Sequence, residues 1–167
     1  MDRVAIALGS NVGDRRGHLD YAVAALRALL ANPVVSRYYD TVPVGASGPQ
    51  AMYLNAALVG DTALAPRAIL DALLAIEKER GRERPYVNAP RTLDLDLILL
   101  GGVVLDEPGL VLPHPRFRER RFVLEPLAAI APDLRDPVSG KTAAELLAAS
   151  VAGSLAGSAA AADSGAA

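Results

Sequence analysis

The amino-acid sequence predicts an α+β fold in which two helices cover one face of a largely antiparallel sheet. Segments that are apolar or β-branched, as strands are, alternate with two segments whose apolar residues recur at helical spacing. In chain order these segments read β-α-β-β-α-β, with Gly- or Pro-containing turns between them. A chain of 167 residues has the length of one domain with its own hydrophobic core.

The first half of the chain supplies the β-α-β-β part of this order. The elements expected here are a strand over 3–8, a helix over 18–31, a strand over 34–40 and a strand over 53–62. The helix ends at Asn32-Pro33, because a residue before proline disfavours helical geometry. The Pro/Gly-rich loop 41–50 joins the last two strands, which we expect to pair as neighbours.

The second half adds α-β and several appended elements. They are a helix from Pro66 to Gly81, a strand over 93–100, a strand over 103–105, and short helices over 122–130 and 142–149. Gly101-Gly102 predicts a tight turn, so 93–100 and 103–105 are expected to form a hairpin. The result is a ferredoxin-like β-α-β-β-α-β sandwich with an appended hairpin and C-terminal helices. Residues 1–150 form its single domain, and the Ala/Gly/Ser-rich tail 151–167 is expected to be disordered.

Composition excludes several classes of protein. There are no cysteines, which excludes disulfide frameworks and thiolate metal sites. No apolar run is long enough to span a membrane, and the first residues do not resemble a signal peptide, so a cytoplasmic protein is expected. The net charge is −2 and only 4% of residues are aromatic, whereas nucleic-acid binders are usually basic and supply stacking side chains.

Two aspartates stand on the strand over 93–100. Alternation places Asp94 and Asp96 on one face together with Ile98 and Leu100, and the leucines at 93, 95, 97 and 99 on the other. The two carboxylates are then about 7 Å apart along the strand. A divalent cation between them would relieve their repulsion, and carboxylate oxygens suit Mg²⁺. The alternative is a solvated sheet face on which two aspartates improve solubility.

Arginines on both sides of this strand favour the metal interpretation. Arg80, Arg82, Arg84 and Arg91 lie within 17 residues of the aspartates, and a second basic cluster, 113–121, contains His114 between two prolines. Guanidinium groups beside a metal site are what a polyphosphate needs, because they neutralise its oxygens. An exposed charged loop, with arginines paired to Glu79 and Glu83, explains one ion pair but not the whole set. His18 is expected to be a surface residue.

Five blocks of the sequence resemble the 6-hydroxymethyl-7,8-dihydropterin pyrophosphokinase family. The blocks are AIALGSN at 5–11, YLNAA at 53–57, IEKERGR at 76–82, NAPRTLDLDLIL at 88–99 and LPHPRFRERRFVLEPL at 112–127. They cover roughly residues 3–135 in order. The resemblance implies an ATP-dependent diphosphotransferase of folate biosynthesis, monomeric, with ATP and the reduced pterin as its partners. Such an enzyme transfers pyrophosphate to the pterin's hydroxymethyl group and releases AMP.

The resemblance also implies roles for individual residues. Asp94 and Asp96 would hold two Mg²⁺ ions, and Arg82 and Arg91 would stabilise charge on the transferring group. The residues expected at ATP are Glu77, Arg84, Arg91, Ile98, His114 and Arg120. Those expected at the pterin are Thr41, Val42, Val44, Tyr53, Asn55 and Phe122, with Tyr53 and Phe122 stacking on the ring. Asn88 stands where some relatives carry a stacking tryptophan.

Three other functions remain open on the residues alone. A ferredoxin-like module that binds a small ligand without turnover would leave the aspartates and arginines unexplained. An RNA-binding domain would need exposed aromatics on the strand over 93–100, which has none. A different ATP-dependent transferase would share the site but not the pterin. Assay of pterin-dependent AMP formation separates all three.

Overall fold

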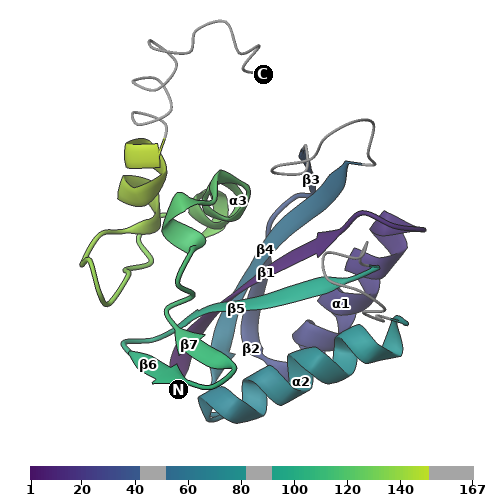
Figure 1. The fold of residues 1–167 in the computed structure, drawn as a ribbon, viewed down its shortest axis with the longest axis horizontal. Coiled ribbons are helices and arrows are strands. Elements are labelled where there is room, and N and C mark those ends of the chain that lie inside the picture. The colour runs from purple at the N-terminus through teal and green to yellow at the C-terminus, as the bar shows by residue number, and fades with distance from the viewer. Residues whose placement is uncertain (42–51, 82–91, 151–167) are drawn as a thin grey trace, which may run out of the picture.

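The structure, a computed structural model, describes residues 1–41, 52–81 and 92–150. Its main sheet has the strand order β2-β4-β1-β5, with the short β3 also paired to β4 (Figure 1). Every pairing in this sheet is antiparallel. The strands are β1 (Asp2–Ser10), β2 (Ala31–Val35), β3 (Tyr39–Thr41), β4 (Tyr53–Thr62) and β5 (Asp94–Leu100). The expected combination of helices with a largely antiparallel sheet is confirmed.

Helices pack on both faces of this sheet. On one face lie α1 (Arg15–Leu29) and α2 (Pro66–Glu79), and on the other lies α3 (Arg121–Ile130) (Figure 1). β1 serves both layers because its side chains alternate: Ile6 and Leu8 join the core under α1 and α2, whereas Ala5 and Ala7 join the core under α3.

The helix expected over 18–31 begins and ends earlier in the structure. α1 starts at Arg15 because the carboxylate of Asp14 caps it, accepting a 3.0 Å hydrogen bond from the Gly17 amide. It ends at Leu29, and the next residues, including Asn32 at a φ of 49°, already belong to β2. The expected strand over 53–62 and the helix that starts at Pro66 are confirmed.

The single strand expected over 34–40 is two strands, β2 and β3, that pair with different stretches of β4. The chain bends between them at Ser36. There the Ser36 amide donates to the Ala57 carbonyl at 2.8 Å, and the Ala57 amide donates to the Ser36 hydroxyl at 2.9 Å. A side-chain oxygen thus replaces a backbone acceptor, which lets the strand break without an unpaired amide.

Simple alternation along β5 is wrong at the strand's C-terminal end. The register with β1 shifts between Ala5 and Ile6, which marks a β-bulge. Leu97 and Ile98 keep the faces that alternation predicts, whereas Leu99 faces α3 and Leu100 faces the core under α1 and α2. The bulge lies after Asp96, so the aspartates keep their predicted face.

The hairpin expected between 93–100 and 103–105 does not form. Gly101 does begin a turn, at a φ of 50°, and the Val103 amide donates to the Leu100 carbonyl at 2.9 Å. The following strand, β6 (Leu105–Glu107), pairs instead with β7 (Leu110–Leu112) around Gly109, at a φ of 77°. This second hairpin carries the chain back toward β5.

The C-terminal helices lie close to their expected ranges. α3 is preceded by the 3₁₀ turn η1 (Phe117–Glu119), and residues 143–150 are helical. Phe117 is buried at 1% exposure and joins Val123 and Leu124 of α3 in the core on that face. Over the described ranges, no helix has the length and apolar character that a membrane crossing requires.

Candidate active site

Three residues on three adjacent strands form one row across the α3 face of the sheet. The β1 register pairs Gly9 with Asn55 of β4 on one side and with Asp94 of β5 on the other. The next row on this face is Ala57, Ala7 and Asp96. Directly opposed residues of an antiparallel pair share a face. Two residues expected at different substrates, Asn55 and Asp94, are therefore separated only by a glycine.

Asp94 and Asp96 project from the same face of β5, as the strand alternation predicts. Both are half-buried, and Leu95 between them is buried in the opposite core. Among the residues that the structure describes, no group of three or more His, Asp or Glu side chains is arranged to hold a metal. Two carboxylates suffice for Mg²⁺, which keeps several waters and is completed by substrate phosphates. The donor set therefore fits this ion.

Glu77 of α2 contacts β5, the strand of the aspartate pair, from the opposite face of the sheet. Its carboxylate is buried at 3% exposure and accepts a 2.7 Å hydrogen bond from the Leu95 amide. This bond satisfies a backbone donor on β5 and ties α2 to the strand at the residue between the aspartates. In this position Glu77 orients the strand that carries Asp94 and Asp96.

His114 docks onto β5 from the segment after β7. Its amide donates to the Ile98 carbonyl at 2.7 Å, and its ring Nδ1 accepts from the Arg116 amide at 3.1 Å. Burial lowers the pKa of His114, the positive charges of Arg120 and Arg116 lower it further, and the Asp94 carboxylate partly opposes them. His114 is thus neutral near pH 7, and because Nδ1 is an acceptor its proton lies on Nε2.

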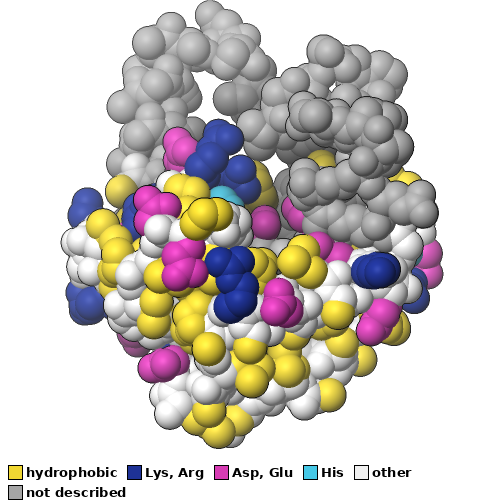
Figure 2. All heavy atoms as spheres, turned by 60° about the horizontal axis from the view of Figure 1, so that its bottom comes forward, with side chains coloured by type: hydrophobic (Ala, Val, Ile, Leu, Met, Phe, Trp, Pro, Cys, Tyr) yellow, Lys and Arg dark blue, Asp and Glu magenta, His cyan; other side chains and the backbone are white. Residues whose placement is uncertain are grey.

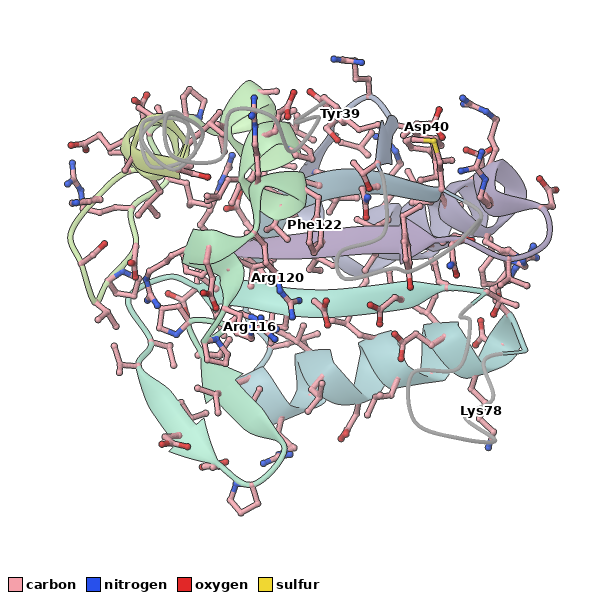
Figure 3. All side chains as sticks on the ribbon, turned by 45° about the horizontal axis from the view of Figure 1, so that its top comes forward. Tyr39, Asp40, Lys78, Arg116, Arg120 and Phe122 are labelled. Atoms are coloured by element: carbon pink, nitrogen blue, oxygen red, sulfur yellow. The ribbon has the colours of Figure 1, made fainter. Side chains whose placement is uncertain are left out.

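Arg116, Arg120 and Phe122 come from the same segment as His114. Figure 3 shows Arg120 beside β5, and Phe122, in the first turn of α3, on the side of β1. The Arg120 guanidinium lies 5.7 Å from the centre of the Phe122 ring. In Figure 2, the one histidine in view lies beside basic side chains with acidic side chains near them. Positive and negative side chains thus lie close together around that histidine.

Three of the residues expected at the pterin, Thr41, Tyr53 and Asn55, lie together at the β3–β4 pair. Thr41 of β3 is opposite Tyr53 of β4, and the Asn55 amide donates to the Thr41 hydroxyl. Asn55 is buried at 6% exposure, and its oxygen lies beside Gly9. An amide held in this way presents a fixed donor and acceptor pattern.

Several expected site residues lie outside the described ranges. They are Val42, Val44, Arg82, Arg84 and Arg91, and Asn88 lies there too. Ile98 is described: its side chain is buried at 2% exposure, and its carbonyl accepts the His114 amide.

His18 was expected at the surface, without a partner; in the structure it is half-buried and accepts a hydrogen bond. The Arg80 Nε donates to His18 Nδ1 at 3.0 Å, and the same guanidinium lies 4.8 Å from the centre of the Tyr21 ring. Burial and the Arg80 charge lower the pKa of His18. The only sequence signal was helical spacing, because His18 and Tyr21 are three residues apart on α1. The position of Arg80, at the end of α2, is a tertiary feature.

The family model for 7,8-dihydro-6-hydroxymethylpterin-pyrophosphokinase matches residues 5–132. This chain belongs to that family. The match contains the aspartate pair, the Asn55 row and the His114 segment. The candidate site therefore lies within the residues that match the family model.

Curated relatives extend the family match over most of the chain. The 2-amino-4-hydroxy-6-hydroxymethyldihydropteridine pyrophosphokinase of Pseudomonas aeruginosa is 45% identical over 151 residues, covering 89% of this chain and 92% of the relative. The protein of the same name from Bacillus subtilis is 46% identical over 133 residues, covering 78% and 79%.

A solved structure shows the same fold. The Plasmodium falciparum HPPK-DHPS structure with pteroate has a TM-score of 0.72 at 12% identity. The match covers 90% of this chain but 44% of the solved one, so this chain spans less than half of that longer protein.

Proposed function

We propose that this pyrophosphokinase family member transfers the β,γ-pyrophosphate of ATP to the hydroxymethyl group of 6-hydroxymethyl-7,8-dihydropterin. The single observation that carries the proposal is the row Asn55, Gly9 and Asp94. It sets a rigid amide and a carboxylate on neighbouring strands of one face. A pterin held at Asn55 would bring its hydroxymethyl oxygen toward a phosphate held at Asp94.

Asp94 and Asp96 are the residues that would hold magnesium, and we propose two ions. When bound, these ions would neutralise the triphosphate oxygens and lower the pKa of the attacking hydroxyl. The chain's part is to hold both carboxylates on one face and at a fixed separation. The hydrogen bond from Leu95 to Glu77 serves this role, because it fixes the backbone between them.

The pterin hydroxyl oxygen would form a bond to the β-phosphorus while the bond from that phosphorus to the α,β-bridging oxygen breaks. AMP leaves, and the hydroxyl proton passes to solvent or to Asp96. Arg82 and Arg91 would stabilise the charge that develops on the transferring group, while Arg84 and Arg120 bind ATP phosphates. Neutral His114 would donate a hydrogen bond from Nε2 to a phosphate oxygen without adding a net charge to the site.

The pterin would lie against the β3–β4 side of the row. Tyr53 and Phe122 would stack on its faces, and Asn55 would pair with its amide edge. Thr41, Val42 and Val44 would complete its hydrogen bonds.

The strand order β2-β4-β1-β5 supports the finer prediction that the fold is ferredoxin-like. In this order β4, the first strand of the second βαβ unit, lies between β1 and β2, the two strands of the first unit.

The decisive experiment measures AMP formation from ATP with and without 6-hydroxymethyl-7,8-dihydropterin, and with and without Mg²⁺. We expect AMP only when both the pterin and the metal are present. Titration calorimetry with a nonhydrolysable ATP analogue supplies the second measurement. Tight nucleotide binding without pterin-dependent AMP would instead favour a different ATP-dependent transferase. Pterin binding without any turnover would favour a ligand-binding module.

A further inference from the structure

A partly buried ion pair connects the segment after α3 to η1, the turn before α3. Arg118 of η1 donates from Nε to Asp136 at 2.5 Å and from Nη2 to the other carboxylate oxygen at 2.9 Å. The Asp136 side chain has no exposed surface, whereas 29% of the Arg118 side chain is exposed. A two-pronged contact of this kind fixes the direction of the guanidinium as well as its distance.

Asp136 is itself held in place by its own segment. Its carboxylate also accepts from the Ser139 hydroxyl at 2.6 Å and from the Val138 amide at 3.0 Å. Its backbone amide donates to the Lys141 carbonyl at 2.8 Å. These donors hold the pKa of Asp136 well below its usual range, with Arg118 as the largest cause. The carboxylate is therefore a charged, immobile anchor.

The anchor holds the same short segment that carries Arg116, Arg120 and His114. Arg116, Arg118 and Arg120 alternate along this short segment, and Phe117 fixes it in the core at 1% exposure. Arg118 is directed to Asp136, whereas the charges of Arg116 and Arg120 act on His114. Figure 3 shows Arg116 and Arg120 on the side of the segment that faces β5. Because the three arginines lie on one short stretch of backbone, a change in the orientation of Arg118 is expected to change the orientation of Arg116 and Arg120.

We propose that Asp136 is a positioning residue for nucleotide binding: by holding Arg118, it aims Arg120 and His114 at the triphosphate. The inference rests on the proposed function, in which these two residues contact ATP. It assigns a role to residues 131–142, which touch neither substrate in that proposal. The effect falls mainly on the ATP side of the row, since the pterin residues Asn55 and Tyr53 are on β4. Phe122 is the pterin residue nearest to this segment, with its ring centre 5.7 Å from the Arg120 guanidinium.

A purely structural role makes a different prediction. Removing one partner of a buried ion pair leaves an uncompensated charge, which destabilises a fold whatever the pair does. Replacing both partners with apolar residues of similar size is often neutral for stability. The two roles can therefore be separated. The apolar pair should restore the stability of the fold, but it cannot restore the orientation of Arg120 and His114.

The experiment uses the full chain and four variants. Asp136→Asn removes the charge and keeps the side chain's shape, and Arg118→Met with Asp136→Leu replaces the pair by apolar side chains. Asp133→Asn is the matched control, because Asp133 is an exposed carboxylate in the same segment. Arg118→Lys keeps the charge but loses the fork. The measurements are melting temperature, the Kd of a nonhydrolysable ATP analogue with Mg²⁺, and the KM values of ATP and pterin.

We expect Asp136→Asn to raise the Kd of the ATP analogue about tenfold while the KM of the pterin changes less than about twofold. Arg118→Lys should show the same pattern more weakly, and Asp133→Asn should match the wild type. The apolar double variant should regain the wild-type melting temperature and keep the weakened nucleotide binding. Recovery of both in the double variant, or equal change in the ATP and pterin constants, would overturn the inference. If the proposed function itself is wrong, the wild type shows no pterin-dependent AMP.

Discussion

Glu77 of α2 accepts a 2.7 Å hydrogen bond from the amide of Leu95, the residue between Asp94 and Asp96. This bond attaches α2 to β5, and the opposite face of β5 carries the candidate metal ligands. Glu77 is buried at 3% exposure, so it acts on this face through the strand. The family resemblance places Glu77 at the nucleotide, and the structure shows that Glu77 also supports the strand that carries Asp94 and Asp96.

This relationship predicts different outcomes for two substitutions of Glu77. Glu77→Ala leaves the Leu95 amide without this acceptor, which should lower the free energy of unfolding by about 1–3 kcal/mol. Glu77→Gln keeps an oxygen that can accept the same hydrogen bond, so it should lower the free energy of unfolding by less. Urea unfolding measures the difference. Equal destabilisation by both variants would show that the charge of Glu77, and not its hydrogen bond to Leu95, matters for stability.

The aspartate pair predicts loss of turnover without loss of the fold. Asp94→Asn or Asp96→Asn should lower kcat by about a thousandfold, since a metal contact at developing charge supplies several kcal/mol. The melting temperature should stay within a few degrees, because removing one of two like charges does not strain the strand. Asp106→Asn, an exposed aspartate on β6, is the control. A variant of Asp94 or Asp96 that keeps a near-normal rate and Mg²⁺ affinity contradicts the assignment.

Gly9 predicts a selective effect on the pterin. A Cβ at this position would approach the Asn55 side-chain oxygen to 3.1 Å, so the amide must shift by a few tenths of an ångström. Gly9→Ala should therefore raise the KM of the pterin about fivefold and leave the Kd of the ATP analogue within about twofold. Gly102→Ala is the matched control, because nothing lies within 4 Å of a Cβ there. A larger effect on ATP than on pterin would count against placing the pterin at Asn55.

The two histidines predict the pH dependence of stability. The pKa values of His18 and His114 are both lowered in the folded chain from the ordinary value of 6.5. As the pH falls below 6.5, the unfolded chain takes up protons first, so the free energy of unfolding decreases until the lowered pKa values are reached. Above pH 6.5 these groups contribute no slope.

Chemical denaturation between pH 5 and 8 tests this dependence. The double variant His18→Asn with His114→Asn should lose this slope, because an Asn oxygen can replace Nδ1 as an acceptor but does not titrate. An unchanged slope in the double variant would assign the pH dependence to carboxylates instead.

The sequence predicted the elements that depend on local pattern. The period-2 alternation placed Asp94 and Asp96 on one face, and the signature blocks around them identified the family. β1, β4 and α2 lie close to their expected bounds because each has a continuous apolar pattern bounded by turn residues. The outcome for the substrate roles of Arg82, Arg84 and Arg91 lies outside the described residues and stays a prediction.

Tertiary structure decided what no local pattern contains. The bulge in β5 exchanges the faces of Leu99 and Leu100, and the Ser36 hydroxyl splits one expected strand into two. Arg80 reaches His18 across 62 residues, and Arg118 reaches Asp136 across 18. Strand periodicity and helix spacing are properties of neighbouring residues, so a sequence displays them directly. The partner of a buried charge or backbone group depends on which elements pack together, and that choice is made by the whole core.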